Sequence, residues 1–333
     1  MMSTKIVCYG VRDIEVTYFN KLNNFGYEIE LVSDFLNYEN AAKAIGADAV
    51  MIRGNCKADR KNIEFLASNG VKYILTRTVG YNHIDLEAVK EFKMRIATVP
   101  VYSPNAIAEL AVTLAMMLLR NTAYAASKTR KKDFTVDSKM FSKEIRNCTV
   151  GVIGTGKIGL TSAKLFKGLG AKIVGYDVFQ SDAAKEVVEF MALKEVLSKS
   201  DIVTIHVPYI KGVNYHMINE EFISKMRKGA ILINTARGEL QDNDAISDAL
   251  ESGKLGGYGT DVFEGESSFF SKNLRGRELE NKAVNKLVDM FPKVIVTPHI
   301  GSFTDQALTN MISISYKNMN EFITAGKCEN EIA

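Results

Sequence analysis

The sequence predicts an α/β protein built from two doubly wound parallel sheets. Short runs of Val, Ile and Ala alternate with amphipathic stretches, and the 333-residue length is about twice that of one typical domain. Continuous apolar runs indicate strands that helices cover on both faces, as in parallel sheets. The strands are predicted at Lys5–Gly10, Ala49–Ile52, Tyr73–Thr76, Thr149–Ile153, Lys172–Tyr176, Ile202–His206, Ala230–Asn234 and Val294–Thr297.

Composition narrows the class of protein. Hydrophobic residues make up 46% of the chain and charged residues 24%, which is typical of a globular protein and not of a disordered one. A net charge of +3 gives no reason to expect a nucleic-acid or membrane partner. The four cysteines are scattered, without the spacing of a zinc site or a disulfide framework. We therefore expect a cytoplasmic protein without a bound metal.

A long apolar helix is predicted from Ser103 to Arg120, between the two groups of strands. Ser103 suits the N-cap and Pro104 the first helical position. We expect this helix to bridge the two domains. Its apolar character suggests a homodimer, and burial within one subunit explains it equally well.

A glycine-rich turn follows the strand that ends at Ile153. Gly154 permits a tight turn, Gly156 lets the backbone approach a pyrophosphate, and Gly159 lets the following helix pack against the strand. Asp177 ends the next strand, where its carboxylate can accept both hydroxyls of a ribose and repel a 2′-phosphate. The turn predicts NAD binding, although a methyltransferase can carry a similar turn, so other residues must identify the reaction.

Three further segments carry polar residues past the ends of predicted strands: 233–238, 258–266 and 296–299. Ligands of an open α/β sheet bind beyond the carboxyl ends of its strands. These segments deliver an arginine, carboxylates and a histidine to that edge. We expect the three side-chain types to converge on one small substrate.

Together with other motifs, these segments resemble the D-isomer-specific 2-hydroxyacid dehydrogenases over essentially the whole chain. The motifs are the glycine turn 154–159, Tyr-Ser-Pro-Asn at 102–105 and Val-Pro at 207–208. Within that family, the Glu-Gly-Glu at 264–266 and Phe-Thr at 303–304 resemble the branch of the D-lactate and (R)-2-hydroxyglutarate dehydrogenases.

The resemblance implies two Rossmann-like domains and a set of cofactor contacts. An NAD-binding domain, residues 102–300, is inserted into a discontinuous flavodoxin-like substrate domain, residues 1–101 and 301–333, with the active site in the cleft between them. The family implies NAD as cofactor, a small 2-oxo or 2-hydroxy acid as substrate and a homodimer. The implied NAD-binding residues are Gly154, Thr155, Gly156, Lys157, Ile158, Gly159, Asp177, Val207, Pro208, Asn214, Thr235, Ala236 and Asp261.

The resemblance also implies that Arg237, Glu266 and His299 are catalytic, and their chemistry suits the reduction of a 2-oxo acid. The planar fork of Arg237 can hold the substrate carboxylate through two hydrogen bonds. A protonated His299 can donate a proton to the carbonyl oxygen as hydride reaches the carbon, and it is the base in the reverse direction. Glu266, with Glu264 as its alternative, would orient the ring and stabilise its protonated form.

None of the other histidines is assigned a catalytic role, and His83 is interpreted as structural. His83 and His206 lie beside segments that the family uses for substrate and cofactor, and His216 is interpreted as a surface or helix-capping residue. The family binds the substrate carboxylate through the amides of Val79 and Gly80.

Arg53 follows the predicted strand Ala49–Ile52. Lactate-preferring members of the family usually carry uncharged residues at this place. A cation there can pair with a second carboxylate, so we expect a dicarboxylic substrate such as 2-oxoglutarate. Pyruvate and a broad set of branched or aromatic 2-oxo acids are the alternatives, as is a solvent-facing Arg53. Tyr102 and Phe303 would shape the rest of the pocket.

A second class of function also fits the resemblance, because NADH-sensing corepressors are similar to this family. Those proteins carry extended tails, and residues 302–333 leave little room for one. We therefore expect an enzyme.

Overall fold

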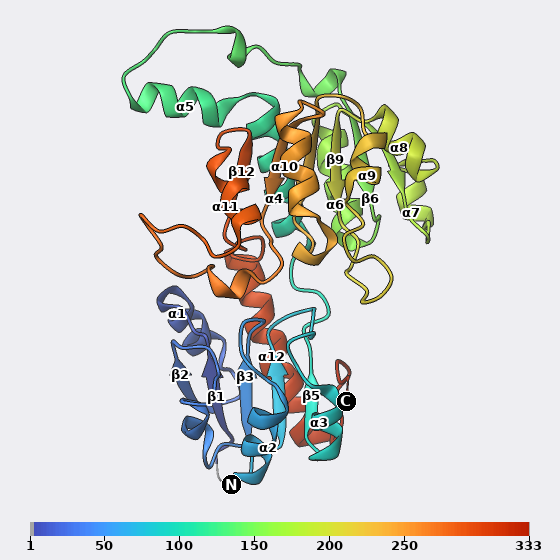
Figure 1. The fold of residues 1–333 in the computed structure, drawn as a ribbon. Helices are drawn as coiled ribbons and strands as arrows, with labels where there is room; N and C mark the ends of the chain where they lie inside the picture. The colour runs from blue at the N-terminus through green and yellow to red at the C-terminus, as the bar shows by residue number, and fades with distance from the viewer. Residues whose placement is uncertain (1–2, 333) are drawn as a thin grey trace. The chain divides into compact units, whose positions relative to one another are not determined.

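The computed structural model describes residues 3–332, which form two compact units (Figure 1). Unit 1 comprises the described residues up to Ser103 and those from Phe303 onward, and unit 2 is Pro104–Ser302. Both divisions lie two residues later than predicted. Helix α4 begins at Pro104 and Thr304 caps α12, so each division falls just before a helix. The substrate role of unit 1 stays a prediction.

Unit 1 contains a five-stranded sheet in the order β2-β1-β3-β4-β5, with all neighbouring strands parallel. This is the flavodoxin-like order of a doubly wound sheet. The strands are β1 (Lys5–Tyr9), β2 (Glu28–Val32), β3 (Ala49–Ile52), β4 (Tyr73–Thr76) and β5 (Arg95–Ala97).

Helices cover both faces of this sheet. On one face, α1 (Asp13–Leu22) and α12 (Asp305–Ala325) pack on the strands, and on the other α2 (Arg60–Ser68) and α3 (Leu86–Glu91) do so. Tyr316 of α12 donates a hydrogen bond to the carbonyl of Phe19 at 3.2 Å. The C-terminal helix thereby completes the core that the first hundred residues begin.

Unit 2 contains a seven-stranded parallel sheet in the order β8-β7-β6-β9-β10-β11-β12. Counted along the chain, this is the Rossmann order 3-2-1-4-5-6 with one more strand at the edge. The strands are β6 (Thr149–Ile153), β7 (Lys172–Tyr176), β8 (Glu189–Phe190), β9 (Ile202–Ile205), β10 (Ala230–Asn234), β11 (Leu255–Thr260) and β12 (Val294–Val296).

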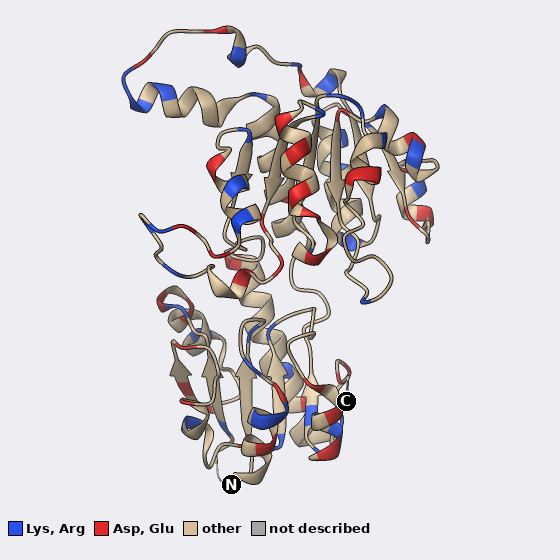
Figure 2. Ribbon diagram, viewed as in Figure 1, with Lys and Arg blue, Asp and Glu red and all other residues tan. Residues whose placement is uncertain are grey.

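The helices of unit 2 form two layers around this sheet. One face packs against α4 (Pro104–Leu119) and α6 (Lys157–Gly168). The other face packs against α8 (Leu193–Lys199), α9 (Glu220–Lys225), α10 (Asn243–Glu251) and α11 (Lys282–Asp289). Two further helices are α5 (Thr122–Arg130) and the short α7 (Asp182–Lys185). Figure 2 shows charged residues mainly on helices and loops, while the strands are mostly uncharged, as burial on both faces requires.

All eight predicted strands are present, five of them with the predicted bounds. Four strands are missing from the predicted list: β2, β5, β8 and β11, of which β11 was anticipated only through the segment 258–266 at its end. The first three are outer strands of their sheets, whereas β11 lies inside its sheet and carries three glycines in place of a continuous apolar run. Because an outer strand is less buried, it tolerates polar residues, as β2 does with Glu28 and Glu30, and the continuous apolar run is lost.

The apolar helix α4 is buried within unit 2. Glycines in β11 let it approach closely: a Cβ on Gly259 would lie 3.0 Å from Cβ of Leu114, and one on Gly257 would lie 3.1 Å from Cδ2 of Leu118. Burial within one subunit therefore accounts for most of its apolar character.

Within residues 3–332, no single helix has the length and apolar composition needed to span a membrane. One bent pair, α4 and α5, meets that test jointly, with 68° between the two helices.

Candidate active site

The glycine turn after β6 is packed so tightly that two of its glycines cannot carry side chains. A Cβ on Gly159 would lie 1.9 Å from the carbonyl oxygen of Gly154, and a Cβ on Gly154 would lie 2.8 Å from the amide nitrogen of Val207. Gly154 also has a φ of +87°, which favours glycine. At Gly156, by contrast, a Cβ would meet no described atom within 4 Å. The turn thus packs tightly against the protein at Gly154 and Gly159 and leaves free space at Gly156.

Asp177 lies beside this turn, at the end of β7. Its Oδ2 accepts hydrogen bonds from the backbone amide of Thr155 and, at 3.1 Å, from the hydroxyl of the same residue. Its Oδ1 accepts one from the amide of Phe179 at 3.0 Å. The carboxylate is therefore fixed next to the first residues of the turn, where α6 begins with Lys157 and Ile158.

The segment 207–217, which follows β9, is called the β9 loop here. Asn214 closes this loop on itself, because its side chain accepts from the amide of Ile210 at 2.7 Å and donates to the carbonyl of Pro208 at 2.8 Å. Asn214 thus shapes the loop that carries Val207 and Pro208. Its direct contact with a cofactor stays a prediction.

These residues fit a bound dinucleotide. Thr235, at the end of β10, has a buried hydroxyl without a hydrogen-bond partner among the described residues. Such an orphaned group is uncommon unless a ligand or water completes it. The open space at Gly156 and the N-terminal amides of the 12-residue helix α6 suit a pyrophosphate.

A buried polar network holds the segment that carries Arg237. The side-chain amide of Asn234 donates to the carbonyl of Arg237 at 3.0 Å and to Oε1 of Gln241 at 2.6 Å. That same oxygen accepts from the hydroxyl of Tyr258. Arg237 itself donates to the carbonyl of Ala236 at 2.6 Å. Gln241 and Tyr258 were not predicted as site residues, although an asparagine at the end of a buried strand needs hydrogen-bond partners of this kind.

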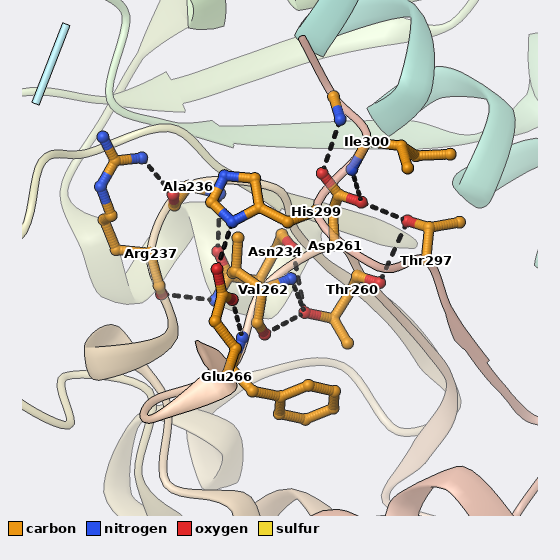
Figure 3. Close-up of polar contacts among 12 residues, drawn as sticks. Asn234, Ala236, Arg237, Thr260, Asp261, Val262, Glu266, Thr297, His299 and Ile300 are labelled. Carbon is orange, nitrogen blue, oxygen red and sulfur yellow. Dashed lines mark hydrogen bonds and ion pairs between the residues drawn. The ribbon is translucent and has the colours of Figure 1, made fainter. Parts of the chain in front are cut away.

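Glu266 and Nδ1 of His299 are hydrogen-bonded (Figure 3). The second carboxylate oxygen of Glu266 accepts from the amide of Phe263 at 2.9 Å. The Glu266 side chain is 16% exposed and that of His299 is 46% exposed. The pair thus has a fixed, mostly buried carboxylate and an accessible ring whose Nε2 remains for a ligand.

The two carboxylates of the Glu-Gly-Glu motif have different partners. Glu264 accepts from the hydroxyl of Tyr215 at 3.0 Å and lies 3.3 Å from Nε2 of His216. Glu266 therefore pairs with His299, while His216, whose side chain is 33% exposed, contacts Glu264 near the surface.

Asp261 holds the backbone of the His299 segment. Its carboxylate accepts from the hydroxyl of Thr297 at 2.6 Å and from the amides of Ile300 and Gly301, each at 2.8 Å. His299 has a φ of +53°, which is rare for a residue with a side chain, and its amide donates to the Asp261 carbonyl at 3.0 Å. Burial raises the pKa of Asp261. The structure thus gives Asp261 a positioning role, and the implied cofactor contact stays a prediction.

Two histidines are unsuited to donate a proton at neutral pH. Desolvation lowers the pKa of His83 and that of His206 to about 4, so both rings are neutral. His206 lies 2.9 Å from the hydroxyl of Thr204, and His83 lies 3.5 Å from that of Thr76. This environment is consistent with the structural interpretation of His83.

The residues implied in substrate binding lie in unit 1. Arg53 donates to the carbonyl of Gly10 at 3.2 Å. The ring of Phe303 packs under the guanidinium of Arg12, with 4.1 Å from Cζ to the ring centroid. The carbonyl of Tyr102 accepts from Asn310 of α12.

The Val79–Gly80 segment follows β4 of unit 1. Val79 is 45% exposed, and the hydroxyl of Thr78 donates to the carbonyl of Gly80 at 2.6 Å. The substrate roles of both residues stay predictions.

No group of three or more His, Cys, Asp or Glu residues that could hold a metal ion occurs among residues 3–332.

Comparisons with known proteins agree with this geometry. The family model described as "D-isomer specific 2-hydroxyacid dehydrogenase, NAD binding domain" matches residues 112–301. An aromatic 2-oxoacid reductase of Clostridium sporogenes is 39% identical over 329 residues, 98% of each chain. A D-lactate dehydrogenase of Lactiplantibacillus plantarum is 39% identical over 331 residues, 98% of this chain and 99% of that one.

Solved structures resemble the whole chain as well. The NAD-complexed form of a D-isomer specific 2-hydroxyacid dehydrogenase from Lactobacillus delbrueckii ssp. bulgaricus has a TM-score of 0.86 and 34% identity, covering 99% of this chain and 100% of that one. The pyruvate reductase of Chlamydomonas reinhardtii has a TM-score of 0.91 and 33% identity, covering 98% of each chain.

Backbone contact at Gly238 fastens the Arg237 segment to the Glu266 segment. A Cβ on Gly238 would lie 2.0 Å from the carbonyl carbon of Phe263 and 2.1 Å from the amide nitrogen of Glu264. We expect Gly238→Ala to force these backbones apart and to lower the free energy of unfolding by about 2 kcal/mol. Urea denaturation measures the loss. Amide hydrogen exchange should be faster in residues 261–268.

Gly168→Ala is the matched control, because a Cβ there would meet no described atom within 4 Å. Its stability should equal that of the wild type or exceed it by up to about 1 kcal/mol. Wild-type stability and exchange in Gly238→Ala would contradict the close contact.

Proposed function

The chain belongs to the D-isomer-specific 2-hydroxyacid dehydrogenase family, and we propose that it reduces a dicarboxylic 2-oxo acid, such as 2-oxoglutarate, to the (R)-2-hydroxy acid. Its reaction class is that of an NAD-dependent D-2-hydroxyacid dehydrogenase. The proposal adds two statements to that class: the role of each site residue and the preferred substrate.

The proposed roles follow from the contacts of each side chain. Arg237 binds the carboxylate next to the carbonyl group, since a guanidinium can offer two parallel N–H donors. Bound NADH supplies the hydride that reduces the carbonyl carbon. Because Glu266 occupies Nδ1 of His299, Nε2 donates the proton to the carbonyl oxygen. In the reverse direction, Nε2 accepts the hydroxyl proton.

Glu266 suits the task of stabilising a protonated His299. Its carboxylate is mostly buried, and the Phe263 amide fixes its second oxygen. An ionised carboxylate at hydrogen-bond distance favours the charged ring and selects one ring orientation. The Asp261 contacts described above hold the backbone from which the ring projects.

An unbalanced group of charges in unit 1 supports the dicarboxylic substrate. Arg77 and Glu15 form a buried ion pair, with 3.5 Å between Nη1 and Oε2 and side chains that are each 1% exposed. Glu15 also accepts from the backbone amide of Arg12 at 2.9 Å. The carboxylate among the groups that act on Arg53 is this same Glu15, which already forms the ion pair with Arg77.

The single observation that carries the substrate assignment is the environment of Arg53. Burial, followed by the charges of Arg12 and Arg77, lowers the pKa of Arg53 to about 10, while Glu15 acts in the opposite direction. Arg12 and Arg77 thus add positive charge near Arg53, and Glu15, the carboxylate among the groups that act on it, is already paired with Arg77. A desolvated cation needs an anionic partner. The second carboxylate of a substrate meets that need, and pyruvate has none.

The names of two relatives support two alternative substrates for this chain. D-lactate dehydrogenase and aromatic 2-oxoacid reductase relatives are both 39% identical to this chain. Pyruvate and phenylpyruvate are therefore the comparison substrates for the test of specificity.

The catalytic roles predict a loss of turnover with retention of cofactor. We expect His299→Ala and Arg237→Ala each to lower kcat/KM by about 10²-fold or more, because each removes a group that acts on the reacting carbonyl or its carboxylate. NADH affinity, measured by fluorescence titration, should remain that of the wild type. Near-normal turnover in either variant contradicts the assignment.

Arg53→Ala tests the substrate assignment. The ratio of kcat/KM for 2-oxoglutarate to that for pyruvate should fall about 30-fold or more, equivalent to at least about 2 kcal/mol of a desolvated charge pair. Arg60→Ala is the matched control, because Arg60 lies in unit 1 with a side chain that is 51% exposed. An unchanged ratio in Arg53→Ala would overturn the dicarboxylic assignment while leaving the reaction class intact.

We also propose a homodimer in which the segment 131–147, called the arm here, contacts the second copy. Figure 1 shows α5 and the arm projecting from the rest of unit 2. Phe134, Val136 and Phe141 are 75, 86 and 89% exposed. Lys128 of α5 binds Asp137 at 2.9 Å, which orders the arm that displays these side chains. Ordered apolar groups of this kind are typical of an interface.

Sedimentation velocity at micromolar concentration tests the dimer. The wild-type chain should sediment as a dimer and the double variant Phe134→Ser, Phe141→Ser as a monomer, because polar side chains remove the apolar contact. A monomeric wild type, or a dimeric double variant, contradicts the proposed interface.

A further inference from the structure

The β9 loop contacts the glycine turn at one end and Glu264, the first carboxylate of the Glu-Gly-Glu motif, at the other. At its start, Val207 packs against Gly154, where a Cβ on the glycine would lie 2.8 Å from the valine amide nitrogen. Near its end, the hydroxyl of Tyr215 donates to Glu264 at 3.0 Å, and Nε2 of His216 lies 3.3 Å from the same oxygen. We call Tyr215, His216 and Glu264 the clasp.

The clasp residues of the β9 loop are held in a defined geometry. The rings of Tyr215 and His216 stack, with 3.9 Å between centroids and 16° between planes. His216 has a φ of +50°, and its amide donates to the carbonyl of Glu239 at 2.9 Å. A left-handed backbone at a residue with a side chain persists only where its surroundings determine it. The backbone of the loop and the stacking of the two rings therefore hold both side chains toward Glu264.

Glu264 and Glu266 share one tight turn. Gly265 between them has a φ of +69°, and the amide of Phe263 donates to Glu266 at 2.9 Å. One carboxylate of this turn contacts the β9 loop and the other contacts His299. A displacement of Glu264 would consequently displace Glu266 as well.

We propose that Glu264 is a positioning residue, which links the β9 loop to the Glu266–His299 pair through the clasp. Ordering of that loop next to the glycine turn would then fix Glu266 against His299. The catalytic consequence rests on the proposed function, whereas the clasp itself is a property of the folded chain.

We expect the clasp to fix the position of Glu264 while contributing little to the free energy of unfolding. The side chains of His216 and Glu264 are 33 and 43% exposed, and ion pairs at such positions contribute little to the free energy of unfolding. A loss of the clasp should therefore reduce kcat while leaving the KM for the 2-oxo acid, which Arg237 binds, and the unfolding temperature unchanged.

The kinetic test compares Glu264→Ala, Glu264→Gln and Tyr215→Phe. Glu264→Ala should lower kcat about tenfold, as expected for coupled neighbours, with unchanged substrate KM and Tm. Glu264→Gln retains an oxygen that can accept from Tyr215, so most of the activity should return. Tyr215→Phe combined with Glu264→Ala should be no slower than Glu264→Ala alone. Glu280→Ala, an exposed carboxylate of the same unit, is the control and should be unaffected.

Amide hydrogen exchange provides a readout independent of turnover. In Glu264→Ala, with NADH present, residues 207–217 should exchange about tenfold faster than in wild type, because a local restraint is lost. Glu280→Ala should exchange as the wild type does. The proposal would be overturned by unchanged exchange or by an unchanged kcat in Glu264→Ala. A loss of kcat accompanied by a clear decrease in Tm would also overturn it.

A failure of the proposed function would look different. If the wild-type chain reduces no 2-oxo acid, the proposed function is wrong. The hydrogen exchange of residues 207–217 in Glu264→Ala then still tests whether the clasp restrains the β9 loop.

Discussion

A hydrogen bond between Glu266 and Nδ1 of His299 is the interaction on which the rest of the site depends. It occupies one ring nitrogen and leaves the other for a ligand, so it decides which atom of His299 can exchange a proton. The surrounding structure serves to hold its two ends. The Phe263 amide fixes the carboxylate, and Asp261 fixes the strained backbone that carries the ring.

The parallel sheet of unit 2 makes this pairing possible. Strands β10, β11 and β12 are neighbours, so the segments that follow them leave the sheet at one edge. Arg237, Glu266 and His299 each lie on one of these segments. Gly238 then lets the first two segments touch backbone to backbone, a contact that any side chain would prevent. The spacing of the site is thus fixed by main-chain contacts as much as by side-chain hydrogen bonds.

Features encoded in short stretches of sequence could be predicted, and features made by distant contacts could not. Most of the central strands and the glycine turn have local patterns, and the turn glycines meet the close contacts expected of them. The ion pair between Glu15 and Arg77 joins residues from different elements of unit 1, and no local pattern marks it. The same holds for Asp261, whose position after a strand suggested a ligand contact and not its three bonds to the His299 segment.

Turnover of Glu266→Gln tests most directly whether the Glu266–His299 pair governs the chemistry. Glutamine keeps the size of the side chain but removes the charge that favours a protonated ring. We expect kcat for 2-oxo acid reduction to fall about 10²-fold or more, with NADH affinity unchanged. A kcat equal to that of the wild type would contradict the central role of this pair.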